Sequence, residues 1–293
     1  EGLAFGLDGA TGAPLWQSAV GLSAPFAPLP IPGGEPAALL VDSRDGEVDE
    51  LLRVDGRTGR LVWRQSLDER VADPPLILGN HVIQPLPSGK LSWIDLASGA
   101  RQGTLELGRP LSRTPRADES GQFLYQLADE ANLFVIRRDP PSCQAVVYLG
   151  QDAGSVPCPP ARVGRFLIVP RNTMTGDGLW SVFVLDEDGA RPRPAQTIPI
   201  EGWTWDSPPS MGSVIWSLGD RGGITAMSLG AYDAKEPLKP IASLTPSAER
   251  VGPTYGLPRT ERECWVASAR SGRLDLNPDR REITVPWTTM LPS

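Results

Sequence analysis

The sequence has no apolar run of the roughly 18 residues that a membrane-spanning helix needs. Its first residues lack the basic and apolar regions of a signal peptide, and a signal already removed would leave the same start. The three cysteines form no Cys-x-x-Cys pair, and the single histidine, His81, is far from all of them in sequence. We therefore expect no transmembrane segment and no zinc site.

The chain has 28 basic side chains (Lys and Arg) and 35 acidic ones (Asp and Glu), so its net charge is −7. Without a basic face for phosphate backbones, nucleic acid is not an expected partner. The chain also lacks Gly-x-Ser-x-Gly, a phosphate-binding loop, a dinucleotide fingerprint and His-Glu-x-x-His. His81 has no nearby Ser, Cys or carboxylate with which to form a catalytic set. The sequence therefore predicts no catalytic residues.

Glycine and proline are abundant instead, with 31 of each spread between short apolar runs. Glycine and proline spread in this way are typical of turns between many short strands. At 293 residues, the length permits one large all-β domain as readily as two ordinary domains.

One segment recurs with its landmarks in a fixed order. Leu7–Trp16 aligns without a gap with Val54–Trp63, and a third copy, Ile94–Gly103, ends in glycine where the others have tryptophan. The copies start 47 and then 40 residues apart. Such spacing indicates one four-stranded propeller blade for each repeat.

Each landmark has a structural role in a turn that joins the two outer strands of a blade. The aspartate accepts hydrogen bonds from backbone N–H groups, the Thr or Ser hydroxyl adds another bond, and the glycine takes a positive φ. The tryptophan falls on the outermost strand, where its ring can pack against the adjacent blade. The predicted turn and docking residues are Asp8, Thr11, Gly12, Trp16, Asp55, Thr58, Gly59, Trp63, Asp95, Ser98 and Gly99.

The segment from Asp73 to Gly108 has the order of a complete blade. Pro75–Leu78, His81–Gln84, Lys90–Asp95 and Thr104–Leu107 are its four expected strands, in order from the inside outward. A proline opening the inner strand, a glycine before the third strand and the Asp-x-x-Thr-Gly turn resemble the PQQ-type (pyrroloquinoline-quinone-type) repeat of the quinoprotein-like β-propellers.

This resemblance implies an all-β propeller of four-stranded antiparallel blades. Beyond residue 108 only the rhythm of apolar strands continues. We predict a single domain over residues 1–293 with seven blade positions and an incomplete first blade, and six or eight positions remain open. The approximate blades are 1–21 (partial), 22–70, 71–108, 109–151, 152–202, 203–249 and 250–293.

Three further groups of residues are candidate sites. Asp42, Asp45 and Asp49 lie in the densest acidic segment and are candidate Ca²⁺ ligands, the alternative being a solvated hairpin. Trp203 and Trp205 open a blade, and alternation along a strand puts both indoles on one face, as a partner or ligand contact or as packing between blades. Cys143 and Cys158 are a candidate disulfide between neighbouring blades, the alternative being two buried thiols.

The resemblance leaves three functions open. Non-enzymatic members of the family, which include an outer-membrane assembly lipoprotein and scaffold modules, are similar in size and imply a bacterial, extracytoplasmic protein that binds a protein or peptide and needs no cofactor. The missing half blade fits a piece of a longer polypeptide. Larger members are dehydrogenases that hold PQQ and Ca²⁺, but the adjacent cysteines of many of those enzymes are missing here. The third function is a carbohydrate-binding surface propeller, with Trp203 and Trp205 stacking on sugar rings.

Overall fold

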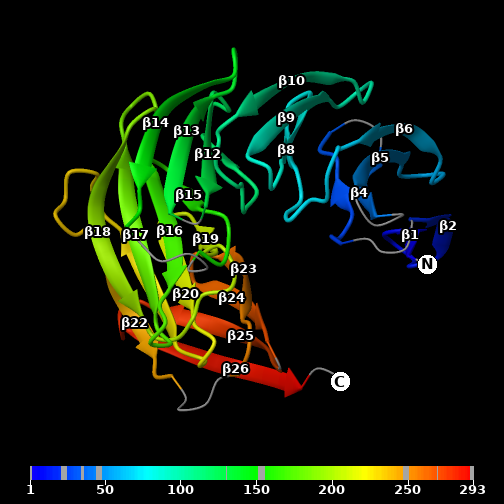
Figure 1. The fold of residues 1–293 in the computed structure, drawn as a ribbon. Helices are drawn as coiled ribbons and strands as arrows, with labels where there is room; N and C mark the ends of the chain where they lie inside the picture. Colours follow the sequence, from blue (N-terminus) through cyan, green and yellow to red (C-terminus); the bar gives the residue numbers. More distant parts are fainter. Residues whose placement is uncertain are drawn as a thin grey trace. The chain divides into compact units, whose positions relative to one another are not determined.

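The computed structural model describes residues 2–20, 25–33, 36–43, 48–129, 131–150, 156–246, 251–268 and 270–290. All regular elements in these ranges are β-strands, and the strands form one two-stranded and six four-stranded antiparallel sheets (Figure 1). None of the described residues belongs to a helix that could cross a membrane. The chain divides into two compact units, Glu1–Pro115 and Arg116–Ser293.

The first unit holds three sheets. β1 (Leu3–Leu7) and β2 (Pro14–Ala19) form the two-stranded sheet. The second sheet consists of β3 (Leu29–Pro30), β4 (Ala37–Ser43), β5 (Asp49–Asp55) and β6 (Leu61–Ser66). The third consists of β7 (Leu76–Leu78), β8 (His81–Pro85), β9 (Lys90–Asp95) and β10 (Arg101–Glu106).

The second unit holds four sheets of four strands. They are β11 (Arg116–Ala117), β12 (Phe123–Ala128), β13 (Asn132–Arg137) and β14 (Ser142–Tyr148); β15 (Ala161–Val163), β16 (Phe166–Asn172), β17 (Gly178–Leu185) and β18 (Pro192–Ile200); β19 (Ser210–Met211), β20 (Val214–Leu218), β21 (Ile224–Leu229) and β22 (Leu238–Leu244); and β23 (Tyr255–Thr260), β24 (Glu263–Ala267), β25 (Arg270–Asn277) and β26 (Glu282–Met290). Within each sheet the strands pair in sequence order.

These sheets agree with the predicted fold class. Apart from Trp203–Trp205, the structure has a strand at every position where the repeat or the apolar rhythm predicted one, and the first sheet has only the two outer strands. The seven predicted blade positions with an incomplete first blade correspond to the seven sheets. That the whole chain is a single domain stays a prediction.

The hydrophobic core lies between the faces of successive sheets. In the first unit, Leu51 and Trp63 of the second sheet pack with Val82 and Ile94 of the third. In the second unit, Trp180 packs with residues of β20 and β21, and a further cluster joins β20 and β21 to β24–β26. Each large apolar side chain that is fully buried in this way contributes about 1.5–3 kcal/mol to folding.

The repeated turn has the same hydrogen bonds in all three copies. The Oδ1 atom of Asp8 accepts the backbone N–H and the hydroxyl of Thr11 at 2.8 and 2.7 Å. Asp55 does the same with Thr58, and Asp95 with Ser98. These hydrogen bonds, above all that from the Thr11 hydroxyl, lower the pKa of Asp8, because they stabilise its charged form.

The two indoles of the repeat each reach the next sheet. Trp16 Nε1 donates to the carbonyl oxygen of Gly56 at 2.8 Å, and Trp63 Nε1 donates to that of Leu96 at 2.9 Å. A Cβ atom on Gly59 would lie 2.6 Å from the ring of Trp16, and one on Gly99 would lie 2.6 Å from that of Trp63. Each indole therefore packs against the glycine of the following turn. The third copy has Gly103 in place of the tryptophan and so lacks this contact.

Candidate functional site

The second unit contains an open groove of about 870 Å³ between the sheets β15–β18 and β19–β22. This volume is within the range of ligand pockets, roughly 300–1,000 Å³. One wall is formed by β18, and the other by β21, β22 and the residues that follow β22. The groove is lined by Asp177, Gln196, Ile198, Pro199, Ile200, Glu201, Ser217, Arg221, Gly223, Thr225, Met227, Leu238, Pro240, Ser243, Leu244, Thr245 and Pro246.

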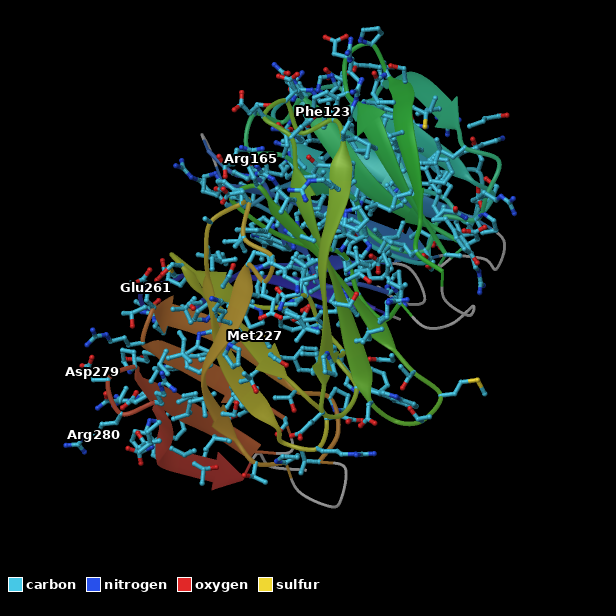
Figure 2. All side chains as sticks on the ribbon, turned by 90° about the vertical axis from the view of Figure 1, so that its left-hand side faces the viewer. Phe123, Arg165, Met227, Glu261, Asp279 and Arg280 are labelled. Carbon is cyan, nitrogen blue, oxygen red and sulfur yellow. The ribbon has the colours of Figure 1, made fainter. Side chains whose placement is uncertain are left out.

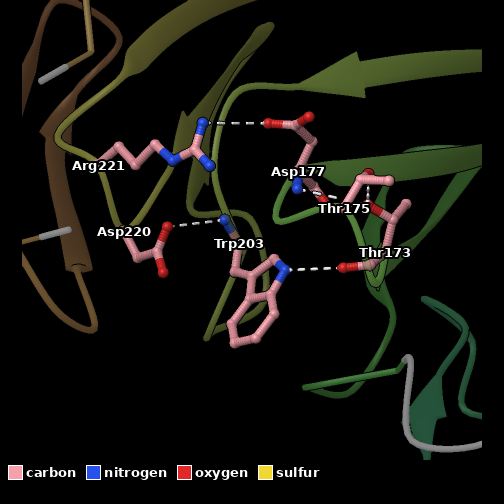
Figure 3. Close-up of polar contacts among 6 residues, drawn as sticks. All are labelled: Thr173, Thr175, Asp177, Trp203, Asp220 and Arg221. Carbon is pink, nitrogen blue, oxygen red and sulfur yellow. Dashed lines mark hydrogen bonds and ion pairs between the residues drawn. The ribbon is translucent and has the colours of Figure 1, made fainter. Parts of the chain in front are cut away.

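Polar contacts join the two sheets at each end of this groove. At one end, the Gln196 amide donates to the carbonyl oxygen of Leu238 at 3.0 Å and accepts its N–H at 2.9 Å. At the other end, Arg221 Nη1 lies 3.4 Å from Asp177 Oδ1 (Figure 3). Both contacts hold the walls in place, so the groove is part of the folded unit.

The floor of the groove is apolar and its rim is polar. Ile198, Met227 and Leu238 belong to one hydrophobic cluster, in which Met227 is buried (labelled in Figure 2). The hydroxyls of Thr225 and Ser243 lie 3.0 Å apart, on the wall formed by β21 and β22. An apolar centre with a polar rim is the composition of a protein-binding surface.

Glu201 is exposed at the charged end of the groove. The part of the chain that the structure describes supplies no ion-pair partner for its carboxylate. Its backbone lies against the β20–β21 turn, where a Cβ atom on Gly219 would come within 2.1 Å of the Glu201 carbonyl oxygen. Glycine at position 219 therefore permits the close approach that places Glu201 at the groove.

Trp203 and Trp205 lie close together, with ring centroids 6.1 Å apart, but the expectation that they lie on a strand is wrong. The backbone of this segment bonds to side chains instead of a neighbouring strand. Thr204 N–H donates to Asn172 Oδ1. Trp203 N–H donates to Asp220 Oδ1 at 2.8 Å (Figure 3). Trp203 Nε1 also donates to the carbonyl oxygen of Thr173 at 3.0 Å. Trp203 is thus half-buried and bonded, whereas Trp205 is 40% exposed.

Two of the three candidate Ca²⁺ ligands, Asp42 and Asp49, are buried and not solvated. They lie at the ends of the paired strands β4 and β5, and Asp45 lies outside the described residues. The Asp49 carboxylate accepts the hydroxyl of Ser43 and, at 2.8 Å, the N–H of Val71. Within the described ranges, no three His, Cys, Asp or Glu side chains gather as metal ligands.

The predicted disulfide is absent. Cys143 and Cys158 are both thiols in the structure, Cys143 exposed on the outer strand β14 and Cys158 buried. Although Cys143 is exposed as a residue, neighbouring atoms partly desolvate its thiol, which disfavours the thiolate and raises the pKa of the thiol. The alternative of two buried thiols therefore applies to Cys158 alone.

The groove was not predicted from the sequence. Gln196, Glu201 and Arg221 belong to no repeated motif, and their proximity depends on which sheet lies opposite β18. The one usable signal was the glycine-rich turn Gly219–Gly223 after a buried strand, because such a turn often permits another segment to approach closely.

A smaller groove of about 470 Å³ occupies a similar place in the first unit, between the β6–β7 connection and the sheet β7–β10. Here the charged side chains are paired with one another. Arg101 bonds to Asp68 at 2.5 Å, Lys90 lies 3.9 Å from Glu106, and Glu69 accepts hydrogen bonds from Ser88. As far as the described residues show, the two grooves therefore differ in whether a charged side chain lacks a polar partner.

A family match and a similar crystal structure both relate this chain to the same protein family. Residues 1–183, more than half of the chain, match the family described as outer membrane protein assembly factor BamB. No curated protein matches the sequence. BamB from Moraxella catarrhalis has a similar crystal structure, with a TM-score of 0.74 at 15% identity over 99% of this chain and 83% of that one.

A functionally unknown protein from Desulfotomaculum acetoxidans is also similar, with a TM-score of 0.61 at 12% identity over 82% of this chain and 76% of that one. At such identities the similarity of the structures shows the β-propeller fold alone, and family membership rests on the family match. The chain belongs to the family of outer membrane protein assembly factor BamB.

Proposed function

We propose that this chain is a non-catalytic β-propeller scaffold that binds a protein or peptide partner during the assembly of outer membrane proteins. Its membership of the BamB family supports this role, and an extracytoplasmic location in a bacterium follows from it. The identity of the partner is open, and the protein needs neither PQQ nor Ca²⁺ for this role.

The observation that carries the proposal is the groove between β15–β18 and β19–β22. Its apolar floor, its hydroxyl-bearing rim and Glu201, which has no ion-pair partner among the described residues, suit recognition of a polypeptide. Its lining residues include no Cys, His or Lys, and its serines Ser217 and Ser243 have no histidine beside them to act as a base. The groove therefore offers contact surface and not a nucleophile with its base.

Site-specific photocrosslinking in the source cell tests the proposal. Benzoylphenylalanine is placed at one of three exposed positions, Thr245 at the groove, Trp205 at the indole pair and Tyr148 on the outer strand β14. We expect at least one position to crosslink to an outer membrane protein or to another assembly factor, identified by mass spectrometry.

Two results together would refute the scaffold role. They are the absence of any crosslinked protein at all three positions, and oxidation of alcohols or sugars by the purified protein when PQQ and Ca²⁺ are added. A dehydrogenase would then be the better assignment.

A further inference from the structure

We propose that the groove between β15–β18 and β19–β22 binds a short extended peptide segment that carries a lysine or arginine opposite Glu201 and apolar side chains on the groove floor. The segment is held by its side chains and does not join either sheet as an added strand. This inference rests on the proposed function and specifies the ligand of the same site.

The dimensions of the groove fit an extended chain. Its lining follows β18 from Gln196 to Glu201. Five residue steps along a strand, at about 3.3 Å each, span ~16 Å. An extended segment of about five residues therefore fills the groove from the Gln196 contact to the Glu201 end.

The outer strands are unsuited to strand addition. β18 contains Pro192, Pro194 and Pro199, and β22 contains Pro240. Proline occurs on edge strands with its nitrogen turned away from the ladder, so it removes donors from the open edge. At the start of β22, the Gln196 amide already bonds to both backbone polar groups of Leu238. A ligand must therefore gain its affinity from side chains.

The floor provides apolar contacts at the spacing of an extended chain. Side chains two residues apart on an extended segment point the same way. Ile198 of β18 and Pro240 and Leu244 of β22 line the groove and keep accessible apolar surface. Met227 and Leu238 lie buried beneath this surface, and the hydroxyls of Thr225 and Ser243 lie beside it. Alternate apolar residues of the ligand can therefore face the floor while the residues between them face the rim and solvent.

The charge at one end selects a basic residue. Arg221 is engaged with Asp177, so among the described residues Glu201, which is exposed and lines this end of the groove, has no ion-pair partner. These three side chains have a net charge of −1, in a chain whose own net charge is −7. A lysine or arginine at this end of the ligand would pair with Glu201 and be favoured by the field of the whole protein.

The groove of the first unit serves as an internal control. Its acidic side chains Asp68, Glu69 and Glu106 all have partners among the residues around it. A basic ligand would have to break one of these contacts to bind there. The inference thus predicts one peptide site per chain, in the second unit.

Fluorescence anisotropy with the complete chain tests the ligand class. The probes are the fluorescein-labelled hexapeptide Lys-Leu-Thr-Leu-Thr-Leu and its reverse sequence, which place the lysine at either end. We expect saturable binding of at least one probe. Ser243→Trp, which fills the groove from an exposed rim position, should abolish it, whereas Thr197→Trp, on the opposite face of β18, should not.

A charge exchange tests the role of Glu201. Glu201→Lys should weaken binding of the lysine probe about fivefold, the effect of one exposed ion pair, and should strengthen binding of a probe with Glu in place of Lys. Glu187→Lys makes the same change at an exposed turn of the same sheet, outside the groove, and should leave both affinities unchanged. Circular dichroism checks that all variants are folded.

Backbone methylation tests how the peptide is held. Probes N-methylated at both threonines lack two backbone donors, and we expect them to bind as well as the parent probe. Loss of binding on methylation would show strand addition and refute the proposed mode.

The ligand inference is wrong if neither lysine probe binds, or if Ser243→Trp binds the probe as tightly as the original protein. Crosslinks from Trp205 or Tyr148 would in that case still support the scaffold role, so the failure of one proposal is distinguishable from the failure of the other.

Discussion

Gly59, like Gly99, combines two requirements that the other glycines of the repeat meet separately or not at all. Its φ is +68°, and the ring of Trp16 lies where a Cβ atom would be. Gly12 has a similar φ of +72° but open space around it, and Gly9 has neither constraint. Backbone conformation and side-chain packing can therefore be measured separately within one motif.

We predict a graded loss of stability when each of these glycines is replaced by alanine. Gly9→Ala should change the free energy of unfolding by less than about 0.5 kcal/mol. Gly12→Ala should cost about 1 kcal/mol through the left-handed backbone alone, and Gly59→Ala about 2–4 kcal/mol because the indole must also move. Urea denaturation measures all three, and equal effects at Gly12 and Gly59 would show that the indole contact contributes little.

Residues of the repeated turn were accessible from sequence because the same residue types recur at the same spacing. Asp8, Asp55 and Asp95 each accept bonds from the hydroxyl residue three positions on. Gln196 and Glu201 could not be found in this way. Neither residue belongs to a motif that recurs in the sequence. Each lies next to residues about 20 to 40 positions away, and the packing of two sheets brings these residues together.

At the scale of strands, the apolar rhythm was sufficient wherever a ladder provides the backbone hydrogen bonds. It failed at Trp203–Trp205, where a strand was expected. There the side chains of Asn172 and Asp220 bond to the backbone of Trp203 and Thr204 in place of a neighbouring strand. Side chains from distant residues that replace a ladder leave no periodic signal in the segment that they hold.

The Gln196 contact between β18 and β22 gives a prediction at this scale. Gln196→Met keeps the length of the side chain but leaves the N–H and C=O of buried Leu238 without partners. We expect a loss of about 1–3 kcal/mol in the free energy of unfolding. Gln144→Met is the matched control, because Gln144 is exposed and bonds only to nearby Ser142, and it should cost less than about 0.5 kcal/mol.

Equal stability of the two variants in urea would mean that water replaces the Gln196 amide without cost. In that case the groove would be open at both ends, and the length of its ligand would not be limited by this contact.

At the scale of the whole molecule, the repeat predicted the architecture but did not decide between a scaffold and an enzyme. PQQ-type blades occur in enzymes and in scaffolds, so the repeat fixes how sheets are built and not what they bind. The groove that we propose as the binding site lies outside the repeat, in the second unit, where the turn motif is lost.

We predict that PQQ together with Ca²⁺ does not raise the melting temperature, with EDTA as the control. A ligand that binds the folded state raises it by mass action. Here the described residues provide no cluster of three acidic, His or Cys ligands for the metal, and a chain of net charge −7 disfavours a quinone that carries carboxylates. A shift of several degrees that requires both ligands would contradict the scaffold role and justify assays for dehydrogenase activity.

The contact between each indole and the next glycine couples neighbouring sheets of the first unit. Trp16 depends on the turn that contains Gly59, and Trp63 depends on the turn that contains Gly99, whereas neither turn needs the indole to form its own hydrogen bonds. Because the free energy of each contact is shared by the two sheets that make it, the sheets behave as a row of units coupled to their neighbours. Local opening of the third sheet should therefore free Trp63 and loosen the second sheet, and opening of the second sheet should free Trp16 and loosen the first.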